Sequence, residues 1–186
     1  MKRFAVLASL ALASAVADAA VTRSVIDVPT SAGPQRIVEV RGDVVSAYLV
    51  SLAGGSGVYN IQPDGSMPSP EGACSPPIRN MWELAALGIA VVAVNSRNDR
   101  VDEILAFLHT RNDVPTWLSG GNAGTGAAAT WAANLPRSVP LGLLVVAPQP
   151  IAPGLAASIE RPTLVMQHAQ DATAFGQQLH DNLTSA

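Results

Sequence analysis

The feature that most limits the fold of this chain is the alternation of short apolar runs with segments of helical periodicity. Such runs are typical of strands that are buried on both faces of a parallel sheet. They are expected at residues 44–52, 89–94, 116–119, 141–147 and 163–167. A hairpin is expected earlier in the chain, at residues 23–28 and 36–40. Because parallel strands need crossover helices, the pattern predicts one α/β domain with a mostly parallel central sheet and helices on both faces.

The segments between these runs predict the helices. Asp99 is a plausible N-cap, Gly88 is a C-cap signal, and residues 123–135 form an alanine-rich segment. Three sets of apolar residues share helical spacing: Ile78, Met81, Trp82 and Ala85; Val101, Ile104, Leu105 and Leu108; and Phe175, Leu179 and Leu183.

The first residues predict an export signal. Lys2 and Arg3 precede an apolar run at residues 4–16, and Ala17-Asp18-Ala19 follows as a cleavage site. The run is shorter than the roughly 20 residues that a membrane span needs. We therefore expect residues 1–19 to be a signal peptide and residues 20–186 to be the folded domain. The mature protein is expected to be periplasmic or extracellular, with no membrane attachment.

Composition excludes several classes of partner. The net charge is −3 and only 13% of residues are charged, so no basic face for nucleic acid is expected. The single cysteine, Cys74, cannot form an intrachain disulfide, and we interpret it as an incidental or buried loop thiol. The three histidines lack the spacing of metal ligands, so the sequence predicts neither a metal site nor a cofactor.

The stretch from Trp117 to Gly126 contains the pattern G-x-N-x-G, centred on Asn122. It has the outline of a strand-to-helix turn in which flanking glycines allow close approach and the middle residue carries an attacking oxygen. A carboxamide is a poor nucleophile with no proton that a histidine could usefully remove. The sequence therefore predicts the strand-to-helix turn with a residue at its centre that is a poor nucleophile.

Together these landmarks resemble the α/β-hydrolase superfamily, and specifically its exported members related to esterase-type serine hydrolases. The loop Gly54-Gly55-Ser56-Gly57 is similar to the family's oxyanion loop. The resemblance implies a three-layer sandwich, with Asn122 in the nucleophile position. The backbone donors that face a ligand oxygen are then expected at Gly54, Gly55, Ser56 and Ala123.

The resemblance also places the acid of a catalytic triad at Asp171, with His168 as a weaker candidate for a displaced base. An N-cap of the last helix is the alternative role for Asp171. The family's histidine follows the acid after a helix and another strand, whereas His180 lies within the predicted last helix. We therefore expect a shortened fold that lacks the last strand. Ser119 and Thr125 are expected to be packing residues rather than substitute nucleophiles.

Three functions remain open from the sequence. The first is a catalytically impaired hydrolase-like protein that binds a small-molecule ligand. The second is a weakly active carboxylic-ester hydrolase that uses a displaced nucleophile or an activated water. The third is a truncated, non-functional relative. A homo-oligomer is also conceivable, because a missing last strand would leave a sheet edge unpaired.

Overall fold

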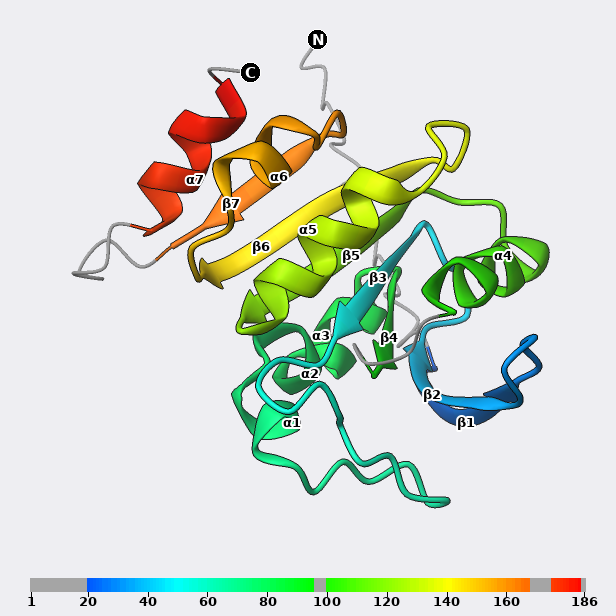
Figure 1. Cartoon of the computed structure of the whole chain (residues 1–186). Helices are drawn as coiled ribbons and strands as arrows, with labels where there is room; N and C mark the ends of the chain where they lie inside the picture. Colours follow the sequence, from blue (N-terminus) through cyan, green and yellow to red (C-terminus); the bar gives the residue numbers. More distant parts are fainter. Residues whose placement is uncertain (1–19, 96–99, 168–174, 185–186) are drawn as a thin grey trace, which may run out of the picture.

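The computed structural model describes residues 20–95, 100–167 and 175–184, and a seven-stranded sheet forms its centre (Figure 1). The strands are β1 (Thr22–Val28), β2 (Gln35–Arg41), β3 (Ala47–Leu52), β4 (Ile89–Val94), β5 (Thr116–Asn122), β6 (Leu141–Pro148) and β7 (Thr163–Met166). Their order is β1-β2-β4-β3-β5-β6-β7. Strand β2 is antiparallel to β1 and β4, and the other pairs are parallel. The mostly parallel sheet predicted from the sequence is confirmed.

Helices cover both faces of this sheet. They are α1 (Pro70–Cys74), α2 (Pro76–Arg79), α3 (Met81–Ala86), α4 (Val101–Arg111), α5 (Gly124–Asn134), α6 (Pro153–Ala157) and α7 (Phe175–Thr184). Helices α2 and α3 contribute to one hydrophobic cluster, and α4, α5, α6 and α7 contribute to the other. Figure 1 shows α5 crossing in front of β5 and β6. The predicted arrangement of helices on both faces is confirmed.

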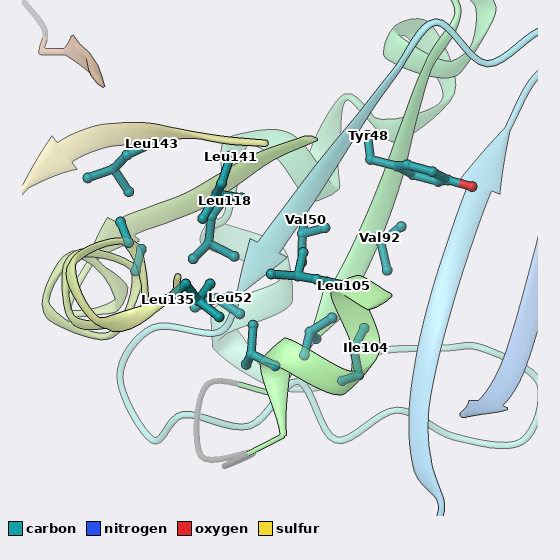
Figure 2. Packing of buried hydrophobic residues seen from close by; sticks show 14 of the residues in the cluster. Tyr48, Val50, Leu52, Val92, Ile104, Leu105, Leu118, Leu135, Leu141 and Leu143 are labelled. Carbon is teal, nitrogen blue, oxygen red and sulfur yellow. The ribbon is translucent and has the colours of Figure 1, made fainter. Parts of the chain in front are cut away.

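The central strands supply both clusters because their apolar side chains point alternately to the two faces. In β3, Tyr48, Val50 and Leu52 belong to the cluster with α4, whereas Leu49 belongs to the opposite cluster. Figure 2 labels Tyr48, Val50 and Leu52 of β3 in the same packed cluster as Ile104 and Leu105 of α4. A strand that is apolar on both faces therefore lies in the middle layer.

The predicted helical segment at residues 78–85 is wrong as one continuous helix. Asn80 separates α2 from α3, and Trp82 is 46% exposed rather than part of the buried face. Asn80 has φ −106° and ψ 21°, outside the helical region, so the chain leaves the helical conformation for one residue before α3 begins. Gly88 follows α3 with φ +83°, which agrees with the predicted helix end.

The predicted burial of the last strand is also wrong. Leu164 and Met166 of β7 are each 51% exposed, whereas Val165 packs against the cluster that includes α7. Among the described strands β7 pairs with β6 alone, so it forms an edge of the sheet. An edge strand covered by helices on one face only keeps alternate side chains in solvent. The predicted signal peptide and the expected N-cap Asp99 lie outside the described residues.

Arg161, which precedes β7, binds the carboxyl-terminal end of α5. Its guanidinium donates to the carbonyl oxygens of Ala132 (3.0 Å), Leu135 (2.7 Å), Pro136 (2.7 Å) and Val139 (2.6 Å). A helix ends with unpaired carbonyls and a partial negative charge, and a planar cation with several donors satisfies both. Arg161 thereby ties α5 to the start of β7.

An ion pair ties α4 to the sheet. The side chain of Glu39 on β2 is fully buried, and its Oε2 accepts a hydrogen bond of 2.8 Å from Nη1 of Arg111. The other carboxylate oxygen, Oε1, has no partner within the described part of the chain. A buried carboxylate depends strongly on its cation, because an unpaired charge away from water is costly.

Replacing Arg161 by alanine is expected to lower the free energy of unfolding by about 2–3 kcal/mol, because four carbonyls lose a charged donor. Lysine should restore only part of this loss, since one ammonium cannot reach all four oxygens. Urea denaturation measures the effect. The exposed Arg137, changed to alanine, serves as the control and should stay within about 0.5 kcal/mol of the parent; equal losses in both variants would contradict the role of Arg161.

Replacing Arg111 by methionine is expected to destabilise the protein by about 2–4 kcal/mol, because Glu39 becomes a buried charge without its cation. Adding Glu39→Gln to that variant should recover part of the stability by removing the charge. Thermal or urea unfolding of the four proteins in this double-mutant cycle gives the coupling between the two side chains. Additive effects of the two substitutions would contradict the pairing.

Candidate functional site

The strand-to-helix turn predicted around Asn122 is present. Strand β5 ends at Asn122 and α5 begins at Gly124, so a single residue, Ala123, connects them. Asn122 is exposed and has φ +47°, in the left-handed region that most residues with a Cβ avoid. Asparagine tolerates this region better than most residues. The chain therefore turns sharply at the carboxyl end of a central strand and presents the Asn122 side chain to solvent.

Glycines bring the loop after β3 against this turn. A Cβ added at Gly54 would lie 3.2 Å from the carbonyl oxygen of Gly121 and 3.3 Å from the amide nitrogen of Gly124. A Cβ at Gly120 would overlap the carbonyl oxygen of Gly124. Gly120 therefore has no room for a larger residue, and a larger residue at Gly54 would force its neighbours to shift. The loop and the turn, predicted from separate parts of the sequence, are thus in contact.

A carboxylate is bound to the same loop. The backbone N–H of Ser56 donates to Oε1 of Glu71 on α1 at 2.8 Å. Gly55 has φ +52°, and a Cβ at this position would lie 2.6 Å from the same Oε1. The Ser56 N–H, followed by the Ser56 hydroxyl, lowers the pKa of the Glu71 carboxyl to about 2. Glu71 is therefore ionised at neutral pH.

A pocket of about 230 Å³ lies between the loop, α1 and the turn. Its described lining residues are Leu52, Gly54, Gly55, Pro70, Glu71, Cys74, Ser75, Pro76, Gly121, Asn122, Ala123 and Gln149. Cys74 is exposed at the end of α1, so the prediction of a buried loop thiol is wrong. Among the described residues that line the pocket, Glu71 alone is acidic or basic, so it gives this wall a negative charge.

A group of three hydroxyls extends behind the pocket wall. Ser51 of β3 is 2.9 Å from the hydroxyl of Tyr59 and 3.2 Å from that of Ser75. Tyr59 is fully buried, and this burial raises the pKa of its hydroxyl above the usual value. Tyr59 therefore stays protonated at neutral pH and cannot serve as a base for Ser75.

The predicted site residues fall into two groups. The pocket brings Gly54, Gly55, Asn122 and Ala123 together, while Ser56 is bound to Glu71 beside it. The proposed acid and displaced base, Asp171 and His168, lie outside the described residues. The loop and the turn therefore line one pocket, whereas the roles of Asp171 and His168 stay predictions.

Other candidates for the chemistry lie elsewhere. Ser119 is 1% exposed within β5, and Thr125 is fully buried with its hydroxyl accepting the Gln149 N–H at 3.3 Å. His109 is in the last turn of α4 and His180 is on α7, and neither lines this pocket. The described residues contain no metal-binding group of three or more His, Cys, Asp or Glu side chains, and no helix with the length and hydropathy of a membrane span.

Sequence reasoning missed several residues of the pocket wall. The sequence does not predict Glu71, Cys74, Ser75 or Gln149 at this pocket. Pro70 and Glu71 do carry the signal of a helix start, a proline in the first turn followed by an acid. That signal predicts α1 but not what α1 touches, since the contact joins segments that are separated by other elements.

Comparison with known proteins supports the architecture. No protein-family model matches the sequence, and no curated protein matches it either. Solved structures do match. A dienelactone hydrolase from Anabaena variabilis aligns with a TM-score of 0.64 and 17% identity, over 88% of this chain and 82% of that one. A cold-adapted esterase from an Arctic intertidal metagenomic library aligns with a TM-score of 0.57 and 12% identity, over 90% and 81% of the two chains.

A carboxyl esterase from the mycorrhizal fungus Tuber melanosporum aligns with a TM-score of 0.57 and 13% identity, covering 94% of this chain and 75% of the esterase. Identities this low relate the folds and carry no activity across. The mostly parallel sheet with helices on both faces is consistent with the fold of these structures. The chain has the α/β-hydrolase fold, as the sequence resemblance predicted.

Proposed function

We propose that this protein is an exported, hydrolase-like protein that binds a small-molecule ligand and has lost the acyl-transfer chemistry of esterases. The observation that carries the proposal is Asn122, which occupies the exposed, left-handed turn between β5 and α5 and lines the pocket. In serine hydrolases of this architecture the corresponding turn presents the nucleophile. On this proposal the protein keeps the shape of the site and lacks the nucleophile.

The chemistry of Asn122 supports impairment. Acyl transfer needs a nucleophile that loses a proton to a neighbouring base and then attacks a carbonyl carbon. A carboxamide nitrogen is neither acidic enough nor nucleophilic enough for that step. No described residue that lines the pocket is a histidine, so an imidazole within reach of residue 122 would have to come from outside the described ranges.

The position of Glu71 supports impairment independently. Its carboxylate already accepts the Ser56 N–H and lies beside Gly55, in the loop that resembles the oxyanion loop. An oxyanion site stabilises negative charge through donors that are aimed at the developing oxygen and are free to bind it. A resident carboxylate occupies one such donor and repels a second negative charge.

The pocket still suits a small ligand. Its volume of about 230 Å³ is below the roughly 300–1,000 Å³ typical of sites for drug-sized molecules. The carboxamides of Asn122 and Gln149 and the hydroxyl of Ser75 supply donors and acceptors on its wall. We infer a compact, partly polar ligand that is bound without turnover.

Export and assembly complete the proposal. Residues 1–19 have the sequence of a secretory signal, and residues 20–186 would then form the mature domain in the periplasm or outside the cell. Self-association is a further proposal, which the half-exposed edge strand β7 supports. Neither nucleic acid nor membrane is proposed as a partner.

A weakly active carboxylic-ester hydrolase is the second candidate, and Ser75 is the observation that favours it. Ser75 lines the pocket, and its hydroxyl lies 3.2 Å from that of Ser51. This arrangement lacks a base, because the neighbouring Tyr59 holds its proton. Any rate would then come from binding and backbone donors, which leave at most about 10³–10⁴-fold over water in disabled triads.

Activity toward p-nitrophenyl acetate tests the proposal. We expect neither the parent protein nor Asn122→Ser to show saturable turnover above the uncatalysed rate, because the carboxamide of the parent is not a nucleophile and a hydroxyl alone lacks its base. A fluorophosphonate probe should leave the parent unlabelled. Saturable turnover by the parent that disappears in Ser75→Ala and persists in Ser119→Ala would contradict the proposal and establish the second candidate.

Stability of variants at residue 122 tests the turn itself. Asn122→Gly is expected to match or slightly exceed the parent, whereas Asn122→Ala should unfold more easily by about 1 kcal/mol, because only glycine enters the left-handed region without strain. Urea denaturation measures both. At the exposed helical position Thr130 the same two substitutions should rank in the opposite order, since glycine weakens a helix interior. The same ranking at both positions would contradict the turn.

A further inference from the structure

We infer that the pocket beside Asn122 accepts neutral or cationic small molecules and discriminates against carboxylates, and that Glu71 is the residue that sets this preference. The inference rests on the proposed ligand-binding role and adds the chemical class of the ligand. It depends on the fixed position of one negative charge in the wall, and on which other charges and dipoles the wall contains.

The Glu71 carboxylate is held in place. The Ser56 N–H binds Oε1 at 2.8 Å, and the side chain starts from α1, whose first residue, Pro70, also lines the pocket. An anion bound by a backbone amide cannot turn away when a ligand enters without losing that hydrogen bond. The charge is therefore a permanent part of the wall.

No cation compensates this charge among the described residues that line the pocket. Arg79, at the end of the neighbouring helix α2, is exposed and is not part of the wall. A carboxylate ligand would therefore meet a like charge with no described arginine or lysine to receive it. An esterified or amidated acid would avoid that repulsion, and an ammonium group would be attracted.

The amino-terminal end of α5 opposes the effect of Glu71 only in part. This helix begins at Gly124, directly after the pocket residues Asn122 and Ala123, and a helix start carries roughly half a positive charge. The full negative charge of Glu71 exceeds that partial charge. The net field in the pocket therefore favours cations over anions, while the helix start still allows hydrogen bonds to a neutral carbonyl.

The remaining polar groups fit the same ligand class. The side-chain carbonyl oxygens of Asn122 and Gln149 can accept hydrogen bonds from an ammonium or an amide N–H, and the Ser75 hydroxyl can donate or accept. A neutral amide would use both kinds of group. A carboxylate has acceptors only, so it could accept from the two NH2 groups and the Ser75 hydroxyl but could not bond to the two carbonyl oxygens or to Glu71, whose charge is what disfavours it.

Cys74 provides a built-in reporter of the charge. It is the single cysteine of the chain, it is exposed, and it lines the pocket. Two methanethiosulfonate reagents modify this thiol, one with a cationic trimethylammonium group and one with an anionic sulfonate group. The ratio of their rates reports the local electrostatic potential. Each rate is divided by the rate of the same reagent with 2-mercaptoethanol, which removes the intrinsic difference between the reagents.

We expect the normalised ratio of cationic to anionic rates to exceed about five in the parent and to fall toward one in Glu71→Gln. Glutamine keeps an oxygen for the Ser56 N–H, so the loop should stay in place while the charge disappears. Glu83 is an exposed residue of α3 outside the pocket, so Glu83→Gln removes an equal charge and should leave the ratio unchanged. A parent ratio near one, or equal falls in both variants, would overturn the inference.

Ligand class is then tested by protection of Cys74 from neutral iodoacetamide, followed by intact-mass spectrometry. Butylammonium, butyramide and butyrate have four-carbon chains and differ in charge. We expect the first two to slow alkylation of the parent and butyrate to do so at least about fivefold more weakly, with the gap closing in Glu71→Gln.

The outcomes separate this inference from the proposed function. Equal protection by butyrate and butylammonium would overturn the charge preference while leaving ligand binding intact. Protection by none of the three probes, in the parent or in Glu71→Gln, would count against ligand binding in this pocket, and the ratio of reagent rates would still decide the sign of its charge. Protection that is the same after Glu71→Gln would remove Glu71 from the role assigned to it.

Discussion

Close packing of backbone against backbone at Gly54 is the constraint on which the site depends. The loop after β3 reaches the turn after β5 because no Cβ separates Gly54 from Gly121 and Gly124. The two strands are neighbours and parallel, so their carboxyl ends are already side by side. Glycine then allows the close approach, because a Cβ at residue 54 would force its neighbours to shift, and the pocket forms at the edge where ligands bind in open α/β sheets.

The charge at this edge of the sheet comes from one carboxylate in the pocket wall. Glu71 binds the loop through the Ser56 N–H, and its ionised carboxylate lies beside Gly55. Asn122 keeps the left-handed turn without an attacking oxygen. Under the proposed function these two features act in the same direction, because Asn122 would not attack a carbonyl carbon and Glu71 would oppose negative charge on an intermediate.

Much of the fold follows from local patterns. Runs that are apolar at every position predict the central strands, because only a middle layer buries both faces, and β3 and β4 have this environment. The same reasoning fails for β7, whose Leu164 and Met166 remain half exposed at the edge. It also fails across Asn80, where short helices replace one long helix. At these places the position of a strand within the sheet and the backbone conformation of Asn80 overrule the hydrophobic pattern.

The sequence by itself determined the order of the strands and the longer helices and the turn at Asn122, because glycine spacing and apolar periodicity act over a few neighbouring residues. Only the tertiary structure decided what faces that turn. Glu71, Cys74 and Ser75 reach the pocket through the packing of α1 and α2 beside β3 and β5, and Gln149 reaches it from the end of β6. Such contacts join residues far apart along the chain, and their chemistry depends on distances that no local pattern encodes.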